Sequence, residues 1–219
     1  MSLEALFVFL RNIDEYLIYY VDIYGTAIYF LLFLIVFSKT AFILLLFLPG
    51  DTVVFTSGAI AAMSNLDLWV LTLLFITAAF LGDQMNYFVG KTVGLTRKRS
   101  KLLKRVITDS MINKSEEYLS RYGRTAILFA RFIPVLRGTL PFTCATTNYS
   151  YRSFMFYNFL GCTIWTSAWL FGGYVLGNIP LVQNNLVVSL FILSIIFVSP
   201  AIINFFVKAK KHRKYLSKI

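Results

Sequence analysis

The chain has 219 residues; 58% of them are hydrophobic and 14% are charged, and 21 basic residues against 10 acidic ones give a net charge of +11. A soluble domain of this length needs far more polar surface, so the composition excludes a soluble protein. Residues 153–177 and 186–207 contain no charged residue, and each segment exceeds the ~20 residues that a spanning helix needs. The sequence therefore predicts an all-α protein that crosses a membrane several times.

The basic residues are concentrated in two places. Seven of the 21 lie between residues 91 and 105, and six lie in the tail at 208–219. Both groups directly follow an apolar segment, as cytoplasmic loops of membrane proteins do, and both can contact anionic lipid headgroups. We therefore expect a basic cytoplasmic segment at 91–124, a basic cytoplasmic tail, and no nucleic-acid partner.

The first 25 residues mix apolar and charged positions. Apolar residues recur at helical spacing from Leu3 to Leu10, which is typical of an amphipathic helix lying in the membrane interface. We expect such an interfacial segment at 1–25, followed by a transmembrane domain at 26–207.

A Pro-Gly-Asp break at residues 49–51 interrupts the first apolar region. The arms on either side, 37–48 and 52–63, are each too short to cross the bilayer. We therefore expect a re-entrant hairpin at about 37–63. A further apolar stretch begins at Leu68 and leads into a Tyr-x-x-Gly motif at 87–90.

A second hairpin follows from counting membrane crossings. If the segment at 91–124 and the tail are both cytoplasmic, the two spans after residue 150 already return the chain to the same side. The apolar segment at 126–149 must then enter and leave on the cytoplasmic face. Arginines and prolines interrupt it, and broken backbone at membrane depth is tolerated where it lines a protein cavity.

A faint internal repeat links the two halves. Residues 47–49 (Phe-Leu-Pro) resemble residues 132–134 (Phe-Ile-Pro), and the Tyr-x-x-Gly motif at 87–90 recurs at 174–177. Because the two spans are expected to run in opposite directions, the repeat would be inverted. Inverted repeats with broken helices are a transporter architecture. Short apolar matches also arise by chance, so both explanations stay open at this point.

Arg131 and Arg137 are the leading candidates for a substrate site. A charge at membrane depth costs about 2.5–3.5 kcal/mol on insertion scales, so each arginine needs a partner or water. A guanidinium group is always protonated, and its fork geometry suits phosphate oxygens. If a half-helix begins after the break, its N–H groups would reinforce an anion site. The alternative is that both side chains reach the interface or pair with a carboxylate inside the protein.

Asp51 and Lys39 are also expected to contact the substrate, and each has a structural alternative. Asp51 follows Pro-Gly, so it can cap a helix, pair with an arginine, or titrate in proton coupling. Lys39 lies among apolar residues and can reach the interface, pair with Asp51 or attract a phosphate.

Further polar and helix-breaking residues are expected to line a cavity. Asp83, Gln84 and Asn86 cluster after an apolar stretch, where a cavity lining and a solvated helix end explain them equally well. Four residues at the two breaks complete the set: Pro49, Gly50, Pro134 and Pro141.

Motifs of catalysis and metal binding are absent from the sequence. The sole histidine, His212, lies in the basic tail, which argues against a histidine-dependent lipid phosphatase. No histidine–cysteine cluster has metal-ligand spacing, and no nucleotide-binding loop or nucleophile-elbow motif occurs. We therefore expect a protein that is not an enzyme and that needs no metal or other cofactor.

Taken together, several segments resemble the DedA (VTT-domain) family of membrane proteins. The combination is specific although each piece is short, and the resemblance covers roughly residues 25–207. In the first half the matching residues are 47–52 (Phe-Leu-Pro-Gly-Asp-Thr), 57–59, 82–84 and 86–90. In the second half they are 130–137 (Ala-Arg-Phe-Ile-Pro-Val-Leu-Arg), 141–142, 154, 157–158, 161, 165 and 173–180.

The resemblance implies two re-entrant hairpins with spanning helices, and movement of anionic lipids across the bilayer. Bacterial members are linked to recycling of undecaprenyl phosphate, and others to phospholipid scrambling or to proton-dependent tolerance, which leaves proton or ion coupling open. The family's functional acid and arginines fall on Asp51, Arg131 and Arg137. The family's hairpin glutamate corresponds to Lys39 here, so the charge at this position is reversed. This difference argues against proton coupling through an acidic pair.

The leading hypothesis is a multi-pass transporter of the cell membrane that moves anionic lipid phosphates, with undecaprenyl phosphate as the expected substrate. One alternative is a less selective phospholipid scramblase. Another is a non-transporting scaffold that recruits partners through its basic segments. Membrane lipids are the expected partners, and association into a homo-oligomer is left open.

Overall fold

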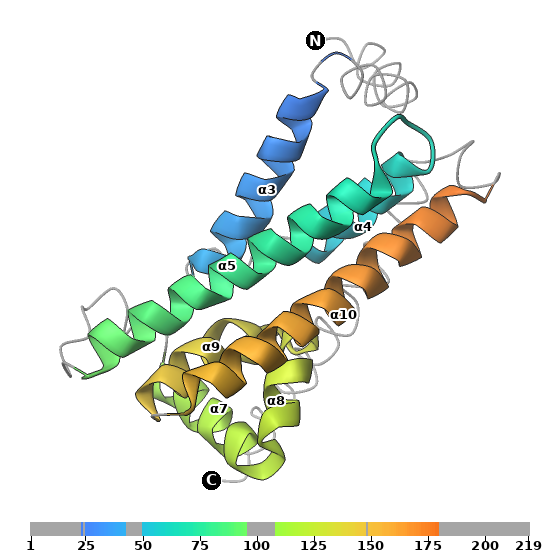
Figure 1. Ribbon diagram of the computed structural model, residues 1–219. Helices are drawn as coiled ribbons and strands as arrows, with labels where there is room; N and C mark the ends of the chain where they lie inside the picture. Colours follow the sequence, from blue (N-terminus) through green and yellow to red (C-terminus); the bar gives the residue numbers. More distant parts are fainter. Residues whose placement is uncertain (1–22, 24, 43–49, 96–107, 148, 180–219) are drawn as a thin grey trace, which may run out of the picture.

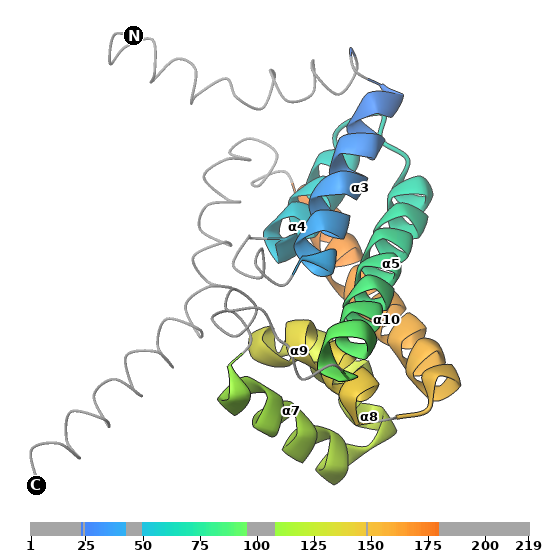
Figure 2. The ribbon, with the colours of Figure 1, turned by 90° about the vertical axis from the view of Figure 1, so that its left-hand side faces the viewer.

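A computed structural model describes residues 23, 25–42, 50–95, 108–147 and 149–179. Every element in these ranges is helical (Figures 1 and 2), so the all-α prediction is confirmed for them. The predicted interfacial segment up to residue 22, the charge-free segment at 186–207, the tail and Pro49 lie outside the described residues.

The helices follow one another without strands in the described ranges. Two of them contain segments long and apolar enough to cross a membrane, at 68–92 and 151–177. In chain order the elements are α3 (Thr26–Ala41), α4 (Gly50–Ala61), α5 (Leu68–Leu95), α7 (Asp109–Tyr122), α8 (Arg124–Phe129), the 3-10 turn η2 (Ala130–Phe132), α9 (Pro134–Thr146) and α10 (Tyr151–Gly177).

The long helices α5 and α10 pack against each other and run in opposite directions (Figure 1). Asp67 fixes the start of α5, because its Oδ1 accepts the N–H groups of Trp69 at 2.7 Å and Val70 at 3.1 Å. The backbone N–H of Asp67 donates to the hydroxyl of Tyr29 on α3 at 2.8 Å. This bond ties the beginning of α5 to the preceding helix.

Each short helix packs against the long helix of the other half, α4 on α10 and α9 on α5. A Cβ on Gly90 would lie 2.7 Å from the carbonyl oxygen of Phe142, and one on Gly177 would lie 2.6 Å from that of Ala59. In both cases another close neighbour is the Cβ of an alanine three residues further on. The two Tyr-x-x-Gly motifs thus make equivalent close contacts between helices, which supports the internal repeat.

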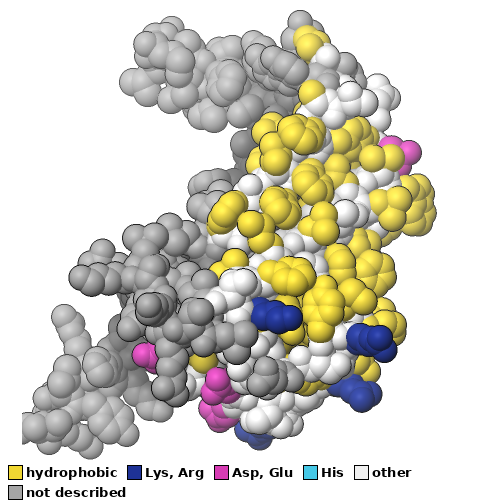
Figure 3. Space-filling view, turned by 60° about the vertical axis from the view of Figure 1, so that its left-hand side comes forward, with side chains coloured by type: hydrophobic (Ala, Val, Ile, Leu, Met, Phe, Trp, Pro, Cys, Tyr) yellow, Lys and Arg dark blue, Asp and Glu magenta, His cyan; other side chains and the backbone are white. Residues whose placement is uncertain are grey.

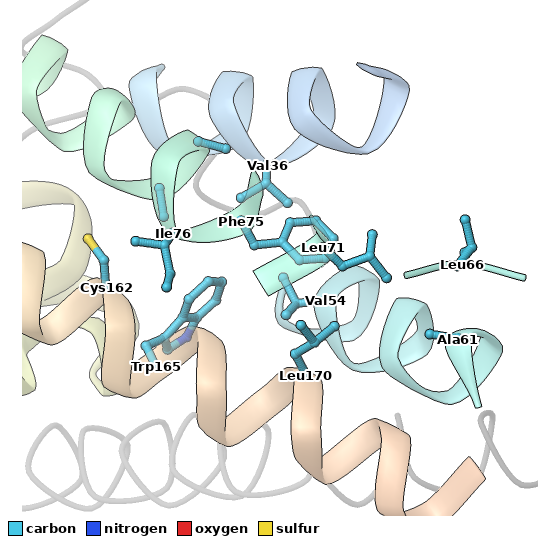
Figure 4. Close-up of a cluster of buried hydrophobic side chains, with 12 residues drawn as sticks. Val36, Val54, Ala61, Leu66, Leu71, Phe75, Ile76, Cys162, Trp165 and Leu170 are labelled. Atoms are coloured by element: carbon cyan, nitrogen blue, oxygen red, sulfur yellow. The ribbon is translucent and has the colours of Figure 1, made fainter. Parts of the chain in front are cut away.

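A buried apolar cluster joins α3 and α4 to both long helices (Figure 4). Val36 comes from α3, Val54 from α4, Leu71 and Phe75 from α5, and Leu170 from α10, and each is at most 1% exposed. Because these side chains interdigitate, α3 and α4 are held as a unit against α5 and α10.

The first predicted hairpin, at about 37–63, falls on α3 and α4, and its residues 43–49 lie outside the described part of the chain. Its first arm is not a separate helix from residue 37, because α3 already begins at Thr26 and ends at Ala41, where Phe42 turns to extended backbone. The second arm, α4, begins at Gly50. With 16 and 12 residues, the two helices are about 24 Å and 18 Å long, which is less than the hydrocarbon core of a bilayer.

The second apolar segment is broken at one proline and not at the other. Ile133 has extended backbone (φ −110°, ψ 110°), and Pro134 starts α9 at the first helical position, where its missing N–H costs nothing. Pro141 does not break the helix, since this residue lies inside α9. The packing of α9 against α5 and α7 holds the helix across the proline.

The described part of the basic segment at 91–124 contains the amphipathic helix α7. Its buried residues Ile112, Ser115 and Leu119 share one face, and the hydroxyls of Ser115 and Thr139 on α9 lie 2.6 Å apart. Gly123, with a φ of 55°, ends the helix. In the view of Figure 3, charged side chains lie mostly towards one end of the described surface, and apolar side chains predominate over the rest of it. This distribution agrees with insertion into a membrane.

Candidate functional site

Five charged side chains, here called the charge cluster, meet between the two halves of the molecule. Each is placed by a helix end, a helix break or the centre of a span. Lys39 lies in the last turn of α3, Asp51 in the first turn of α4, Asp83 in the middle of α5, Arg131 in η2 and Arg137 near the start of α9.

The inner ion pair of the cluster joins Arg131 to Asp83. Both side chains are buried, with 7% and 3% of their surface exposed. The same guanidinium nitrogen of Arg131 also donates to the carbonyl oxygen of Ala79 at 2.9 Å, and the guanidinium lies 5.6 Å from the ring centre of Trp165. The Nε of Arg131 has no hydrogen-bond partner among the described residues. The buried Nε therefore keeps a donor capacity that no described residue satisfies.

The outer ion pair joins Arg137 to Asp51. Nη1 of Arg137 donates to both carboxylate oxygens, at 2.8 Å and 2.9 Å, and Nζ of Lys39 lies 3.5 Å from Oδ1. Asp51 is 37% exposed, Arg137 16% and Lys39 5%. One carboxylate is thus shared by two cations and remains accessible, and the N-terminus of α4 adds to its stabilisation.

Gly50 makes room for Lys39. A Cβ at this position would lie 2.2 Å from Nζ and from Cδ of Lys39, far inside van der Waals contact. The side chain of Lys39 is therefore buried and paired with Asp51, and it does not extend to the interface.

A small, partly open cavity with room for about one water molecule lies against the cluster. Three cations and one carboxylate are among its lining residues, so its charge is positive. The lining consists of Lys39, Thr40, Asp83, Arg131, Arg137, Gly138 and Trp165. A second, smaller cavity shares Asp83, Arg131 and Arg137 with the first, so these three side chains separate the two spaces.

The other residues that were expected to line a cavity lie in different surroundings. Asn86 is buried and donates to the carbonyl oxygen of Thr40 at 2.5 Å, while both amide atoms of the buried Gln84 lack a partner among the described residues. Their burial contradicts the alternative of a solvated helix end. Pro141 lines the second cavity, and the side chain of Pro134 lies outside the described part of the chain.

The N-terminus of α9 offers fewer free N–H groups to an anion than expected. Pro134 has no N–H, and the N–H groups of Leu136 and Arg137 both donate to the carbonyl oxygen of Ile133 at 3.0 Å. Anion binding at this break therefore depends on side chains, because the helix end already satisfies most of its own donors.

Three residues stand out among those of the site that sequence reasoning missed. Trp165 faces Arg131, Asn158 lines the second cavity, and Thr40 lines the first. Asn158 and Trp165 lie seven residues apart in an apolar span and so share one helix face. A polar residue inside such a span was the available signal for Asn158, whereas Thr40 resembles many threonines in membrane helices.

Comparisons with known proteins agree on one family. A model of the VTT domain matches residues 48–175, which include four of the five cluster residues but not Lys39. Protein DedA of Escherichia coli (strain K12) is 37% identical over 196 residues, covering 87% of each chain. An uncharacterized membrane protein of Mycobacterium leprae is 34% identical over 173 residues, covering 77% of this chain and 75% of that protein.

A more distant relative is the inner membrane protein YghB of Escherichia coli (strain K12). It is 28% identical over 160 residues, covering 73% of each chain. No solved structure matches the chain significantly.

Proposed function

Because this chain belongs to the DedA family of VTT-domain membrane proteins, we propose that it moves anionic lipid phosphates across the membrane, with undecaprenyl phosphate as the expected substrate. The observation that carries this proposal is the positively charged cavity whose lining includes Asp83 of α5 and Trp165 of α10, the two helices long and apolar enough to span a membrane. Lys39, Arg131 and Arg137 line it together with a single carboxylate. Guanidinium groups bind phosphate oxygens in pairs, so this lining suits a lipid headgroup better than an apolar or cationic solute.

The headgroup reaches the site through the outer ion pair. Arg137 and Asp51 are partly exposed, whereas Lys39 and Arg131 are buried. Arg137 therefore makes the first contact with a phosphate, and Lys39 and Arg131 supply positive charge further inside. The polyprenyl tail stays in the lipid, so only the headgroup must leave water, and paired cations offset that cost.

The proposed topology has two re-entrant hairpins, formed by α3 with α4 and by α8 with α9. The short lengths of α3 and α4 and the reciprocal packing of α4 on α10 and α9 on α5 support this arrangement. The basic segment at 91–124 and the tail face the cytoplasm in this proposal. Transport needs no catalytic step and no cofactor beyond a coupling proton or ion.

Reconstitution in liposomes tests the proposal. Inward and outward movement of labelled undecaprenyl phosphate is followed under several pH gradients, with labelled phosphatidylcholine as the comparison lipid. We expect selective flux that falls about tenfold or more in Arg137→Ala, because hydrogen bonds to charged groups contribute about 1.5–3 kcal/mol. Arg152→Ala, which removes an exposed arginine at the start of α10, should leave the flux unchanged.

The two alternatives give other outcomes in the same assay. Equal flux of both lipids would identify a scramblase. Absence of flux under every gradient, with membrane recruitment of partners that depends on the basic segments, would identify a scaffold. Normal flux of undecaprenyl phosphate in Arg137→Ala would remove this arginine from the site.

A further inference from the structure

The two carboxylates of the charge cluster differ in how firmly they are held. Asp83 is 3% exposed and pairs with Arg131 inside the protein. Asp51 is 37% exposed and contacts Arg137 and Lys39 from the first turn of α4. Asp51 can therefore leave its partners for solvent, whereas Asp83 has no such route.

Asp51 engages the same cations that face the first cavity. Arg137 presents one nitrogen to both oxygens of the carboxylate, and Lys39 lies 3.5 Å from one of them. A phosphate offers oxygens of the same charge and the same hydrogen-bonding character as a carboxylate. Asp51 and a phosphate are thus competitors for Arg137 and Lys39.

We propose that Asp51 is an exchangeable counter-ion, whose carboxylate holds Arg137 and Lys39 until a phosphate monoester dianion takes its place. This inference rests on the proposed function and deepens it, because it names the charge class of the substrate and the step that admits it. When Asp51 turns outward, it stays at the N-terminus of α4, where the helix dipole still stabilises a free carboxylate.

The charge balance selects a dianion. The cluster contains three cations and two carboxylates, a net charge of +1 while Asp51 is engaged. Once Asp51 has left, the lining of the cavity carries three cations and Asp83, a net charge of +2. A monoester dianion neutralises this charge, whereas a phosphodiester monoanion leaves one positive charge without a partner at membrane depth, which is costly.

Arg131 adds a donor that Asp51 does not use. Its buried Nε has no partner among the described residues, and the side chain lines the cavity. A phosphate that replaces Asp51 can accept from this donor, because a phosphate has more oxygens than a carboxylate. The exchange therefore gains a contact as well as a better charge balance.

Binding of soluble phosphate esters to the detergent-purified full chain tests the exchange apart from transport. Methyl phosphate supplies the dianion and dimethyl phosphate the monoanion, and titrations are run at about pH 7, above the second pKa of about 6 of a monoester. We expect wild type to bind methyl phosphate more tightly than dimethyl phosphate. Asp51→Asn should tighten methyl phosphate binding about tenfold or more, because the competing carboxylate is gone.

Matched variants separate the exchange from a general change of charge. Glu116→Gln removes an exposed carboxylate of α7 and should leave binding unchanged. Lys39→Met should weaken methyl phosphate binding about tenfold, while Lys114→Met, which removes an exposed lysine of α7, should not. If Asp51→Asn does not fold, the preference of wild type for the monoester and its loss in Lys39→Met still decide the question.

The outcomes distinguish the exchange from the proposed function. Equal or weaker binding of methyl phosphate in folded Asp51→Asn, or equal binding of both esters by wild type, overturns the exchange even if undecaprenyl phosphate is transported. Tighter binding in Asp51→Asn without any binding or flux of undecaprenyl phosphate keeps the exchange but assigns the site to free phosphate. Failure of wild type and Asp51→Asn to bind any monoester overturns the exchange.

Discussion

Arg137 and Asp51 lie 86 residues apart in the chain, yet Nη1 of Arg137 is 2.8 Å and 2.9 Å from the two oxygens of the Asp51 carboxylate. This ion pair joins the beginning of α4 to the beginning of α9, the short helices of the two halves. A change at either residue therefore acts on the charge cluster and on the contact between the halves at once.

Arg137→Lys separates charge from geometry at this contact. Lysine keeps the positive charge but loses the planar fork that meets two oxygens together. We expect the flux of undecaprenyl phosphate to fall about tenfold, with a melting temperature close to that of wild type because the pair is partly exposed. The liposome assay measures the flux, and thermal unfolding in detergent measures stability. Full flux in Arg137→Lys would show that charge alone suffices.

Arg131→Met should destabilise the protein more than the removal of an exposed arginine does. The substitution leaves Asp83 buried without its cation, and breaking a buried pair costs about 3–5 kcal/mol. The double variant Arg131→Met/Asp83→Leu removes both charges and should recover most of that loss, although transport stays impaired. Denaturant titration in detergent compares the variants, with Arg152→Met as the exposed control. A double variant as unstable as the single one would contradict an ion-pair explanation.

Gly50→Ala should displace Lys39 from the cluster. The new Cβ would lie 2.2 Å from Nζ of the lysine, so the lysine must move or the start of α4 must shift. We expect a loss of about 1–3 kcal/mol in stability and weaker binding of methyl phosphate. Gly50→Ala/Lys39→Ala should regain the stability but not the binding. If the double variant is no more stable than Gly50→Ala, the clash lies elsewhere.

Gly90→Ala and Gly177→Ala should have similar effects, because the two glycines make equivalent contacts. Each new Cβ would meet a backbone carbonyl oxygen, at 2.7 Å and 2.6 Å, so the helices must move apart, at a cost of about 1–3 kcal/mol. Gly172→Ala is the matched control, since its Cβ would meet only the ring of Phe55 at 3.8 Å. We expect this control to be neutral or stabilising by about 0.5–1 kcal/mol. A large loss in Gly172→Ala would contradict the packing argument.

Features with a local cause could be predicted from the sequence. The apolar segment from Ser153 to Gly177 forms most of α10, and the break at Pro134 lies where the proline pattern places it. Hydrophobicity over a spanning length and the missing N–H of proline act within a few residues, so no partner is needed to recognise them. Pro141 is the counter-example, because packing against neighbouring helices carries α9 past it.

The arrangement of the charges depended on tertiary structure. The residues of the cluster stood out in the sequence because charges are costly at membrane depth. Which carboxylate pairs with which arginine depends on distances of a few ångströms between segments tens of residues apart, because Coulomb and hydrogen-bond energies fall steeply with separation. Only the packed helices therefore decide that Asp83 is sealed with Arg131 while Asp51 stays accessible beside Arg137 and Lys39.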